Sequence, residues 1–428
     1  MQSPRHDVLV VGAGLAGLNA ARLLHEAGLD VLVLEREPQV GGRVRTDTVD
    51  GFTLDHGFQL LNPAYPAARR TWSYPTLDLR PLRAGIRVAR DDRSPVTLLD
   101  PRQEIGSLLG STRTVLGAAL AAPWRLGAFG TYVGLCGYLR PQRLRERPDV
   151  PLGVALRRFG VGRDAVDRLV RPFLSGVFGE DPLRVSRRYA DLVLRSFVRG
   201  VPSVPAAGMQ SLPRALAATL PPEAVMCGIA VSAVRSGWVG TNRGEFHARA
   251  VIVAASGSAL AGLSRRLSAP SMNSLTTWYF AADSASARVV GDQGLLTVDG
   301  RRRRGPLANV AVMSDSVPEY APPGRALIAA TAVGYWPQAQ SAVRARHFAA
   351  DLLQADPADL DEIARYPIAQ ALPRAHPPFP LRRGVSLGDG MFLIGDHRDT
   401  PSIQGALVSG ERGAAAVEDY LFLGELAA

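Results

Sequence analysis

The chain has 428 residues, of which 46% are hydrophobic and 21% are charged, proportions ordinary for a globular protein. No uninterrupted apolar run reaches the ~20 residues of a transmembrane helix, and the two distant cysteines, Cys136 and Cys227, exclude a disulfide framework and fit no metal-ligand spacing. The formal net charge is +10, carried by arginine alone because the sequence contains no lysine. This charge reflects either compositional bias or a surface that favours anionic lipid or nucleic acid.

The first predicted elements are a strand, a glycine-rich turn, a helix and a second strand, which follow one another over residues 7–37. The apolar run at 8–11 is typical of a buried parallel strand, and the turn has the spacing G-x-G-x-x-G. In such a turn the glycines allow a tight bend, close approach to a pyrophosphate and close helix packing, while the carboxylate ending the second strand accepts bonds from ribose hydroxyls. We therefore predict a dinucleotide site at Gly12, Ala13, Gly14, Leu15, Ala16, Gly17, Glu35 and Arg36.

Two segments after the second strand indicate which nucleotide is held. Gly41, Gly42 and Arg43 resemble the G-G-R signature of the flavin amine oxidase superfamily, whose glycines pass close to the FAD diphosphate and whose arginine helps neutralise it. Residues 52–70 resemble the stretch that passes beside the isoalloxazine ring in bacterial squalene-associated and carotenoid desaturases, which implies contacts from Gly57 and Phe58. A plain nicotinamide dehydrogenase needs no such second element. The resemblance therefore implies a resident FAD.

The middle of the chain contains weaker matches to the same superfamily. The apolar segment 104–140 predicts one or two helices that pack in the core, with an apolar entrance touching a membrane as the alternative. Residues 171–186 resemble a stretch of protoporphyrinogen oxidases and related desaturases. Segments 208–234 and 248–256 resemble the strands near the adenosine, where the backbone of Val231 would contact adenine, but both also fit plain core strands.

Three further strands are predicted for the sheet that floors the substrate cavity in this superfamily, at 274–283, 307–315 and 325–334. The arginine run at 301–305 is predicted to be a solvated loop tip between two of these strands. No aromatic residues are interleaved with it as in a nucleic-acid platform, so we expect no nucleic-acid partner.

The last predicted elements are a strand at 391–394 and a helix at 404–420, within a segment that resembles the C-terminal flavin motif of the superfamily. There the aspartate bonds the ribityl or phosphate region, and the start of the helix directs N–H groups at the flavin N1–C2=O edge. The residues implied are Gly395, Asp396, Ser402, Ile403, Gln404 and Ala406. Neither cysteine lies in this motif, so we expect non-covalent FAD.

The scattered FAD segments predict an α/β fold with a discontinuous Rossmann-like FAD-binding domain of the amine oxidase and glutathione reductase type, and a second α+β substrate domain. The FAD domain would comprise residues 1–70, 205–265 and 385–428, and the substrate domain 71–204 and 266–384. Because the N-terminus leads directly into a strand, we expect no signal peptide and a cytoplasmic protein, with peripheral membrane contact as an open alternative.

The predicted activity follows from what the C-terminal motif contains and lacks. Its ending resembles that of plant-type phytoene desaturases and squalene-associated desaturases, with Gln404 replacing the usual acid. Amine oxidases of the superfamily commonly keep a lysine that holds a water at flavin N5 and an aromatic residue in this motif, and both are absent here. We expect a desaturase-like oxidoreductase that moves a hydride between flavin and an apolar isoprenoid or polycyclic molecule. An amine or amino-acid oxidase and a non-catalytic flavoprotein subunit remain as alternatives.

Three residues are candidates for catalysis. His56 and His397 flank the predicted flavin contacts and would donate or accept a proton near neutral pH, or would merely bond the backbone or the flavin edge. Gln59 would orient substrate or flavin. Arg398 and Asp399 are expected to form a structural ion pair, and no metal site is predicted.

Overall fold

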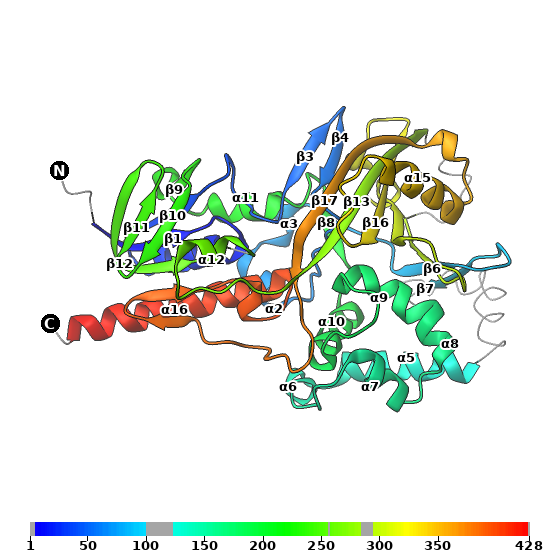
Figure 1. Ribbon diagram of the computed structural model, residues 1–428, viewed down its shortest axis with the longest axis horizontal. Helices are drawn as coiled ribbons and strands as arrows, with labels where there is room; N and C mark the ends of the chain where they lie inside the picture. The colour runs from blue at the N-terminus through cyan, green and yellow to red at the C-terminus, as the bar shows by residue number, and fades with distance from the viewer. Residues whose placement is uncertain (1–4, 100–122, 256, 284–293, 427–428) are drawn as a thin grey trace.

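A largely parallel sheet forms one half of the molecule (Figure 1). The computed structural model describes residues 5–99, 123–255, 257–283 and 294–426. In this sheet the first strand lies between the second strand and the long strand at 244–253, and it runs parallel to both. The strands of the sheet are β1 (Arg5–Val11), β2 (Val31–Glu35), β9 (Val225–Cys227), β10 (Val231–Arg235), β11 (Trp238–Thr241), β12 (Gly244–Val253), β18 (Ser386–Gly388) and β19 (Met391–Leu393).

A seven-stranded sheet forms the upper part of the other half, in the order β17-β13-β16-β15-β14-β6-β7. Its strands are β6 (Gly85–Ala89), β7 (Val96–Leu99), β13 (Met272–Asp283), β14 (Leu296–Asp299), β15 (Leu307–Val312), β16 (Arg325–Val333) and β17 (Asp361–Pro373). Trp278 and Phe280 face α15 (Gln340–Leu353), whereas Tyr279 and Ala281 belong to the core cluster shared with the parallel sheet. The alternation of side chains along a strand therefore gives this sheet one face toward the half that contains the parallel sheet, which we call the nucleotide-binding half after its predicted role.

A group of helices packs beneath the second sheet (Figure 1). It has its own core, in which Tyr132, Leu156, Leu174 and Phe178 are buried. The helices are α5 (Pro123–Tyr138), α6 (Pro141–Arg145), α7 (Leu152–Arg158), α8 (Arg163–Ala165), α9 (Arg171–Phe178) and α10 (Arg187–Arg199). None of the helices in the described part of the chain is both long and apolar enough to cross a membrane.

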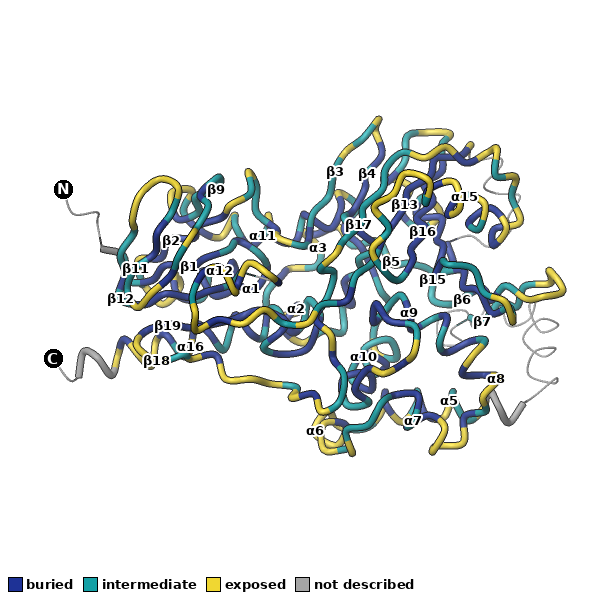
Figure 2. The backbone as a smooth tube through the Cα atoms, viewed as in Figure 1, coloured by how far each residue is buried: buried dark blue, intermediate teal, exposed yellow. Residues whose placement is uncertain are grey.

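Short elements complete the described part of the chain. They are β3 (Thr46–Val49), β4 (Phe52–Asp55), α2 (Pro66–Thr71), α3 (Tyr74–Leu77), β5 (Leu79–Pro81), β8 (Ser203–Pro205), α11 (Ser211–Ala217), α12 (Ala259–Leu263) and α14 (Met313–Ser316). The central strands of both sheets are buried, while the connecting loops and helix ends are exposed (Figure 2).

The two ends of the chain meet where α1 (Leu15–Glu26) crosses α16 (Ile403–Leu426). Asn19, fully buried, donates from Nδ2 to the carbonyl oxygen of Leu407 at 3.0 Å. A Cβ on Gly410 would lie 2.6 Å from the carbonyl oxygen of Ala16, so only glycine permits this close crossing. The helix that follows the glycine-rich turn is thereby fixed against the C-terminal helix.

We expect Gly410→Val to lower the free energy of unfolding by about 2 kcal/mol, because the added side chain must separate two packed helices. Chemical denaturation monitored by circular dichroism measures the effect. Gly134→Val in α5 is the matched control, since a Cβ on Gly134 meets nothing within 4 Å. Equal stability of the Gly410→Val variant and wild type would contradict the close crossing.

The predicted α/β fold class is confirmed, and the strands predicted at 274–283, 307–315 and 325–334 correspond to β13, β15 and β16. The last helix begins one residue earlier than predicted and extends to Leu426. Residues 104–122 of the predicted apolar helices lie outside the described residues, and α5 accounts for the rest. The exact domain boundaries stay a prediction.

Candidate functional site

The glycine-rich turn joins β1 to α1 with the geometry of a dinucleotide-binding turn. Gly12 has φ +108°, a conformation that L side chains rarely adopt. A Cβ on Gly17 would lie 2.1 Å from the carbonyl oxygen of Gly12 and 3.0 Å from the Cβ of Ala254. These two glycines are therefore required by the fold itself.

Gly14 is different, because nothing in the described protein requires a glycine there. Its φ of −80° suits any residue, and a Cβ would meet no atom within 4 Å. It is also the N-cap of α1 and supplies no side-chain cap to the N–H groups of the first turn. Open space in front of unpartnered N–H groups at a helix N-terminus fits a phosphate-bearing group.

Glu35 connects the acidic strand end to this turn. Its side chain is buried, and its Oε2 accepts the backbone N–H of Ala13 at 2.7 Å while its Oε1 accepts that of Glu37 at 3.0 Å. Each carboxylate oxygen keeps further acceptor capacity for a ribose hydroxyl. Arg36, by contrast, extends into solvent and pairs with Glu37.

The G-G-R segment lies directly against the glycine-rich turn. The N–H of Gly41 donates to the carbonyl oxygen of Ala13 at 2.8 Å, and a Cβ on Gly42 would lie 3.3 Å from the Cα of Gly14. The guanidinium of Arg43 donates to the carbonyl oxygen of Ala371 in β17 at 3.0 Å. The segment therefore links the nucleotide turn to the second sheet.

Arg43 also connects the front of the chain to its tail. Its guanidinium donates to Oδ1 of Asp396 at 2.5 Å, across 353 positions of sequence. This places the arginine and the aspartate, which the two flavin motifs predicted separately, in one ion pair. The side-chain amide of Gln59 donates to the carbonyl oxygens of Arg43 and His56 at 2.7 and 2.8 Å. Gln59 therefore orients these two loops.

The C-terminal motif begins at Gly395, whose φ is +138° and whose N–H donates to Ser409 in α16. The 3₁₀ turn η5 (Asp396–Arg398) follows. Burial lowers the pKa of His397 to about 4, and the negative charge of Asp396 offsets this effect only in part. This pKa favours the neutral imidazole at neutral pH, and the buried Nε2 of His397 has no partner among the described residues. Such an orphaned nitrogen fits a bond to a cofactor edge.

The start of α16 is held by its own cap and by α2. Ser402 accepts the N–H of Gly405 at 3.1 Å, while Ile403 and Ala406 pack on the shared core. Gln404 accepts the N–H of Ala67 at 2.9 Å, so its side chain satisfies the N-terminus of α2. The N–H groups of Gly405 and Ala406 are thus used within the protein, and contact of the remaining first-turn N–H groups with a flavin stays a prediction.

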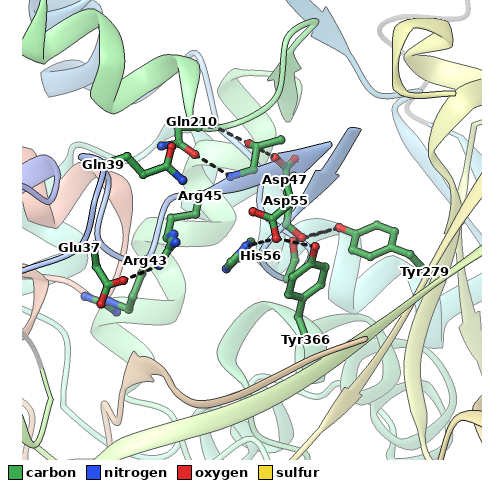
Figure 3. A network of polar contacts seen from close by, with 12 residues as sticks. Glu37, Gln39, Arg43, Arg45, Asp47, Asp55, His56, Gln210, Tyr279 and Tyr366 are labelled. Atoms are coloured by element: carbon green, nitrogen blue, oxygen red, sulfur yellow. Dashed lines mark hydrogen bonds and ion pairs between the residues drawn. The ribbon is translucent and has the colours of Figure 1, made fainter. Parts of the chain in front are cut away.

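His56 belongs to a polar group that the sequence did not reveal (Figure 3). Its Nε2 lies 2.8 Å from Oδ2 of Asp47, and its ring lies 4.5 Å from the ring of Tyr366 in β17. The Tyr366 hydroxyl donates to the same Asp47 oxygen at 2.9 Å. Partial burial by itself would raise the pKa of Asp47. The hydrogen bonds from His56 and Tyr366 outweigh this effect, so the pKa of Asp47 is lowered.

Asp55 lies behind this group and is almost fully buried. It accepts hydrogen bonds from the Thr46 hydroxyl at 2.6 Å, the Met209 N–H at 2.9 Å and the Tyr320 hydroxyl at 2.9 Å. Burial raises the pKa of Asp55 to about 6 despite these three donors. The Tyr279 hydroxyl donates to the backbone carbonyl of Asp55 at 2.9 Å and so fixes the backbone next to His56.

The remaining predicted contacts occupy nearby positions. Gly57 has φ +93°, and a Cβ there would lie 3.0 Å from Cδ1 of Ile368. Phe58 packs on the shared core, and Val231 begins β10 beside the cluster at the ends of β1 and β2. The Val231 contact with adenine stays a prediction.

Two electrostatic predictions differ from the structure. Asp399 pairs with Arg412 at 3.4 Å and not with Arg398, whose guanidinium donates to the carbonyl oxygen of Gly384. The arginine run at 301–305 is only half solvated: Arg301 bonds Asp299 at 2.7 Å, and Arg304 pairs with another carboxylate, while the two central arginines are exposed. No cluster that could hold a metal ion occurs among the described residues.

The site combines a dinucleotide-binding turn with a C-terminal motif that meets it, and a second sheet lies beside them. This combination defines the class of FAD-dependent oxidoreductases. The chain belongs to the family described as flavin containing amine oxidoreductase, whose model matches residues 15–418.

Individual relatives match shorter segments. Putrescine oxidase of Kocuria rosea is 56% identical over 57 residues, which cover 13% of this chain and 12% of that protein. Carotenoid 3,4-desaturase of Haloarcula japonica is 53% identical over 51 residues, covering 12% and 10%. A structure of putrescine oxidase bound to putrescine covers 97% of this chain and 99% of its own, with a TM-score of 0.69 and 17% identity. At this identity the likeness shows the fold, and the substrate does not follow from it.

Proposed function

We propose that the protein binds FAD without a covalent link and oxidises an apolar isoprenoid or polycyclic small molecule. The observation that carries this proposal is the uncharged face that the second sheet turns toward the nucleotide-binding half. Its central positions are Thr277, Tyr279, Ala281, Leu327, Ala329 and Thr331. The two threonine hydroxyls bond each other at 3.0 Å, which uses one of their two O–H donors.

Such a face favours an apolar substrate for a physical reason. A charged substrate buried against alanine, leucine and paired threonines would lose its hydration without gaining a partner. An apolar one gains free energy from leaving water. When bound, the flavin supplies the acceptor for a hydride, and the chain's own residues position the substrate and exclude water.

We further propose that the proton released with the hydride goes to His56. Asp47 accepts a hydrogen bond from Nε2 of His56, and the ring of Tyr366 packs against the imidazole. An imidazole oriented by a carboxylate is a suitable proton acceptor near neutral pH.

His56→Gln is expected to lower kcat on the order of 100-fold, because the proton acceptor is lost. KM should change little, since the uncharged sheet face is unaltered. Steady-state kinetics over a range of pH measures both quantities, and Tyr366→Phe serves as the milder comparison because it keeps the Asp47–His56 contact. An unchanged kcat for His56→Gln would remove this histidine from the reaction.

The activity itself is tested by spectroscopy. The yellow protein is mixed anaerobically with isoprenoid and polycyclic hydrocarbons in detergent, and loss of flavin absorbance identifies a substrate. The same protein is mixed in air with a panel of amines and amino acids, and hydrogen peroxide is measured. Loss of flavin absorbance with hydrocarbons, together with no peroxide from amines, supports the proposal. Peroxide from amines, together with no loss of absorbance with hydrocarbons, would show that the protein is an amine oxidase instead.

A second candidate function is oxidation of an amine. The observation that favours it is the partly exposed carboxylate of Asp47, 39% accessible, beside the rings of Tyr366 and His56. A carboxylate with adjacent aromatic rings binds an ammonium group. Asp47→Asn would then raise KM for an amine, while it would leave KM for a hydrocarbon unchanged.

Non-covalent binding is tested by acid precipitation. We expect all of the flavin to appear in the supernatant, because Cys136 is buried in the helical group and Cys227 ends β9, both away from the C-terminal motif. Absorbance of the supernatant and the pellet measures the partition. Flavin that stays with the washed pellet would show a covalent link.

A further inference from the structure

Five arginine residues from four parts of the chain form one electrostatic group, in which two of the side chains contact a buried carboxylate. The carboxylate is Asp399, whose side chain is 8% exposed. The arginines are Arg145 of α6, Arg382 and Arg383 of the segment before β18, Arg398 of η5, and Arg412 of α16. We call this group the arginine cluster. The segment with Arg382 and Arg383 is exposed where it runs toward β18 (Figure 2).

Backbone carbonyl groups hold several of these guanidinium groups in place. Arg412 donates to the carbonyl oxygen of Arg398 at 3.3 Å and to that of Arg383 at 2.5 Å. Arg398 donates to the carbonyl oxygen of Gly384 at 3.1 Å. The N–H of Arg383 in turn donates to the carbonyl oxygen of Arg398 at 2.9 Å. The guanidinium groups of Arg398 and Arg412 are therefore fixed before any ligand arrives.

The positive charge of the cluster exceeds its negative charge. Asp399 contacts Arg412 at 3.4 Å and Arg382 at 3.8 Å. Two neighbouring acids are already paired elsewhere: Asp149 with Arg188 at 2.9 Å, and Glu411 with Arg70 at 2.9 Å.

The charges of neighbouring guanidinium groups add to the effect of burial at two positions. Burial, with the charges of Arg383 and Arg412, lowers the pKa of Arg398. Burial, with the charge of Arg382, lowers the pKa of Arg145. A multivalent anion placed among these groups would relieve this repulsion.

Arg412 faces away from the site expected for the flavin diphosphate. Gly410 contacts the backbone of α1 beside the glycine-rich turn. Arg412 comes two residues later, about 200° further round the helix, so it lies on the opposite face of α16. It also lies roughly 14 Å along the helix from Ile403, at 1.5 Å per residue.

We propose that the arginine cluster is a second anion site that binds a phosphoryl group. Arginine forms paired hydrogen bonds to phosphate oxygens, and the two fixed guanidinium groups of Arg398 and Arg412 lose little entropy when the anion binds. The phosphoryl group belongs either to a soluble phosphate compound or to a phospholipid headgroup, two sources with the same recognition chemistry.

The test uses the FAD-loaded protein and inorganic phosphate, with sodium chloride at equal ionic strength as the reference. Phosphate is expected to raise Tm above the chloride value, because a ligand that binds only the folded state stabilises it. The double variant Arg145→Gln/Arg383→Gln should lose most of this shift. The control variant Arg302→Gln/Arg303→Gln removes the same charge from two exposed arginines and should keep it.

Vesicles identify the source of the phosphoryl group. Wild type and both variants are sedimented with phosphatidylcholine vesicles that do or do not contain phosphatidic acid. Cosedimentation that needs phosphatidic acid and is lost in the cluster variant assigns a lipid headgroup, while stabilisation by phosphate without cosedimentation assigns a soluble compound.

Two results would overturn the proposal. The first is equal stabilisation of wild type by phosphate and chloride, which would show only screening. The second is a full phosphate shift in the cluster variant, which would place the anion elsewhere. If the double variant does not purify, Arg383→Gln alone serves, because its exposed side chain contributes least to the fold.

Discussion

Gly14→Val is expected to give a folded but colourless protein. The valine would fill the open space in front of the first turn of α1, where a Cβ meets no protein atom, so the fold has room for it. The same space is where a phosphate would approach the helix N-terminus, so FAD binding should be lost. Flavin absorbance of the purified variant and fluorescence titration with FAD measure the loss.

The control for this change is Gly134→Val in α5, which also adds a side chain where nothing lies within 4 Å. It should remain yellow. Circular dichroism and the unfolding midpoint of flavin-free samples should match between the two variants and wild type. A yellow Gly14→Val protein with normal FAD affinity would show that the nucleotide does not bind at this turn.

The pH dependence of stability in flavin-free protein should reveal two buried groups with opposite effects. Burial raises the pKa of Asp55 from 3.8 to about 6, so between these values the folded protein keeps a proton that the unfolded chain releases. Raising the pH through this window therefore lowers the free energy of unfolding by about 3 kcal/mol. Burial lowers the pKa of His397 from 6.5 to about 4, so the unfolded chain binds the extra proton. Raising the pH from about 4 to about 6.5 therefore raises the free energy of unfolding by about 3 kcal/mol.

Single variants separate the two contributions. Asp55→Asn, which keeps an acceptor for the Met209 N–H, should become more stable relative to wild type as the pH rises from about 4 to 6. His397→Asn should show the opposite trend relative to wild type. Urea denaturation at a series of pH values measures both differences. Curves for both variants that run parallel to wild type would contradict the assigned pKa shifts.

The nucleotide turn and the C-terminal motif were predictable because their chemistry is local. The spacing of Gly12, Gly14 and Gly17 after an apolar strand determines the turn, and the acid at the end of the next strand lies close by through parallel pairing. Gly395 and Asp396 likewise follow a strand directly. The sequence could not show that Arg43 and Asp396 form an ion pair.

The polar group around His56 was not predictable, because its partners come from distant strands. Asp47 and Tyr366 are 319 positions apart, and only the register of β17 in the second sheet brings the tyrosine to the β3–β4 hairpin. The same reason explains the ion pair wrongly predicted between Arg398 and Asp399. Neighbouring side chains on a short turn point apart, and Asp399 finds its partner on α16 instead.

The central claim is that the front and the tail of this chain hold one FAD together, and hydrogen exchange with mass spectrometry tests it most directly. Flavin-free protein is compared with the same protein after addition of FAD. We predict slower exchange in two segments, residues 12–18 and residues 395–406, with the same dependence on FAD concentration. Protection of only one segment, or of neither, would contradict the account.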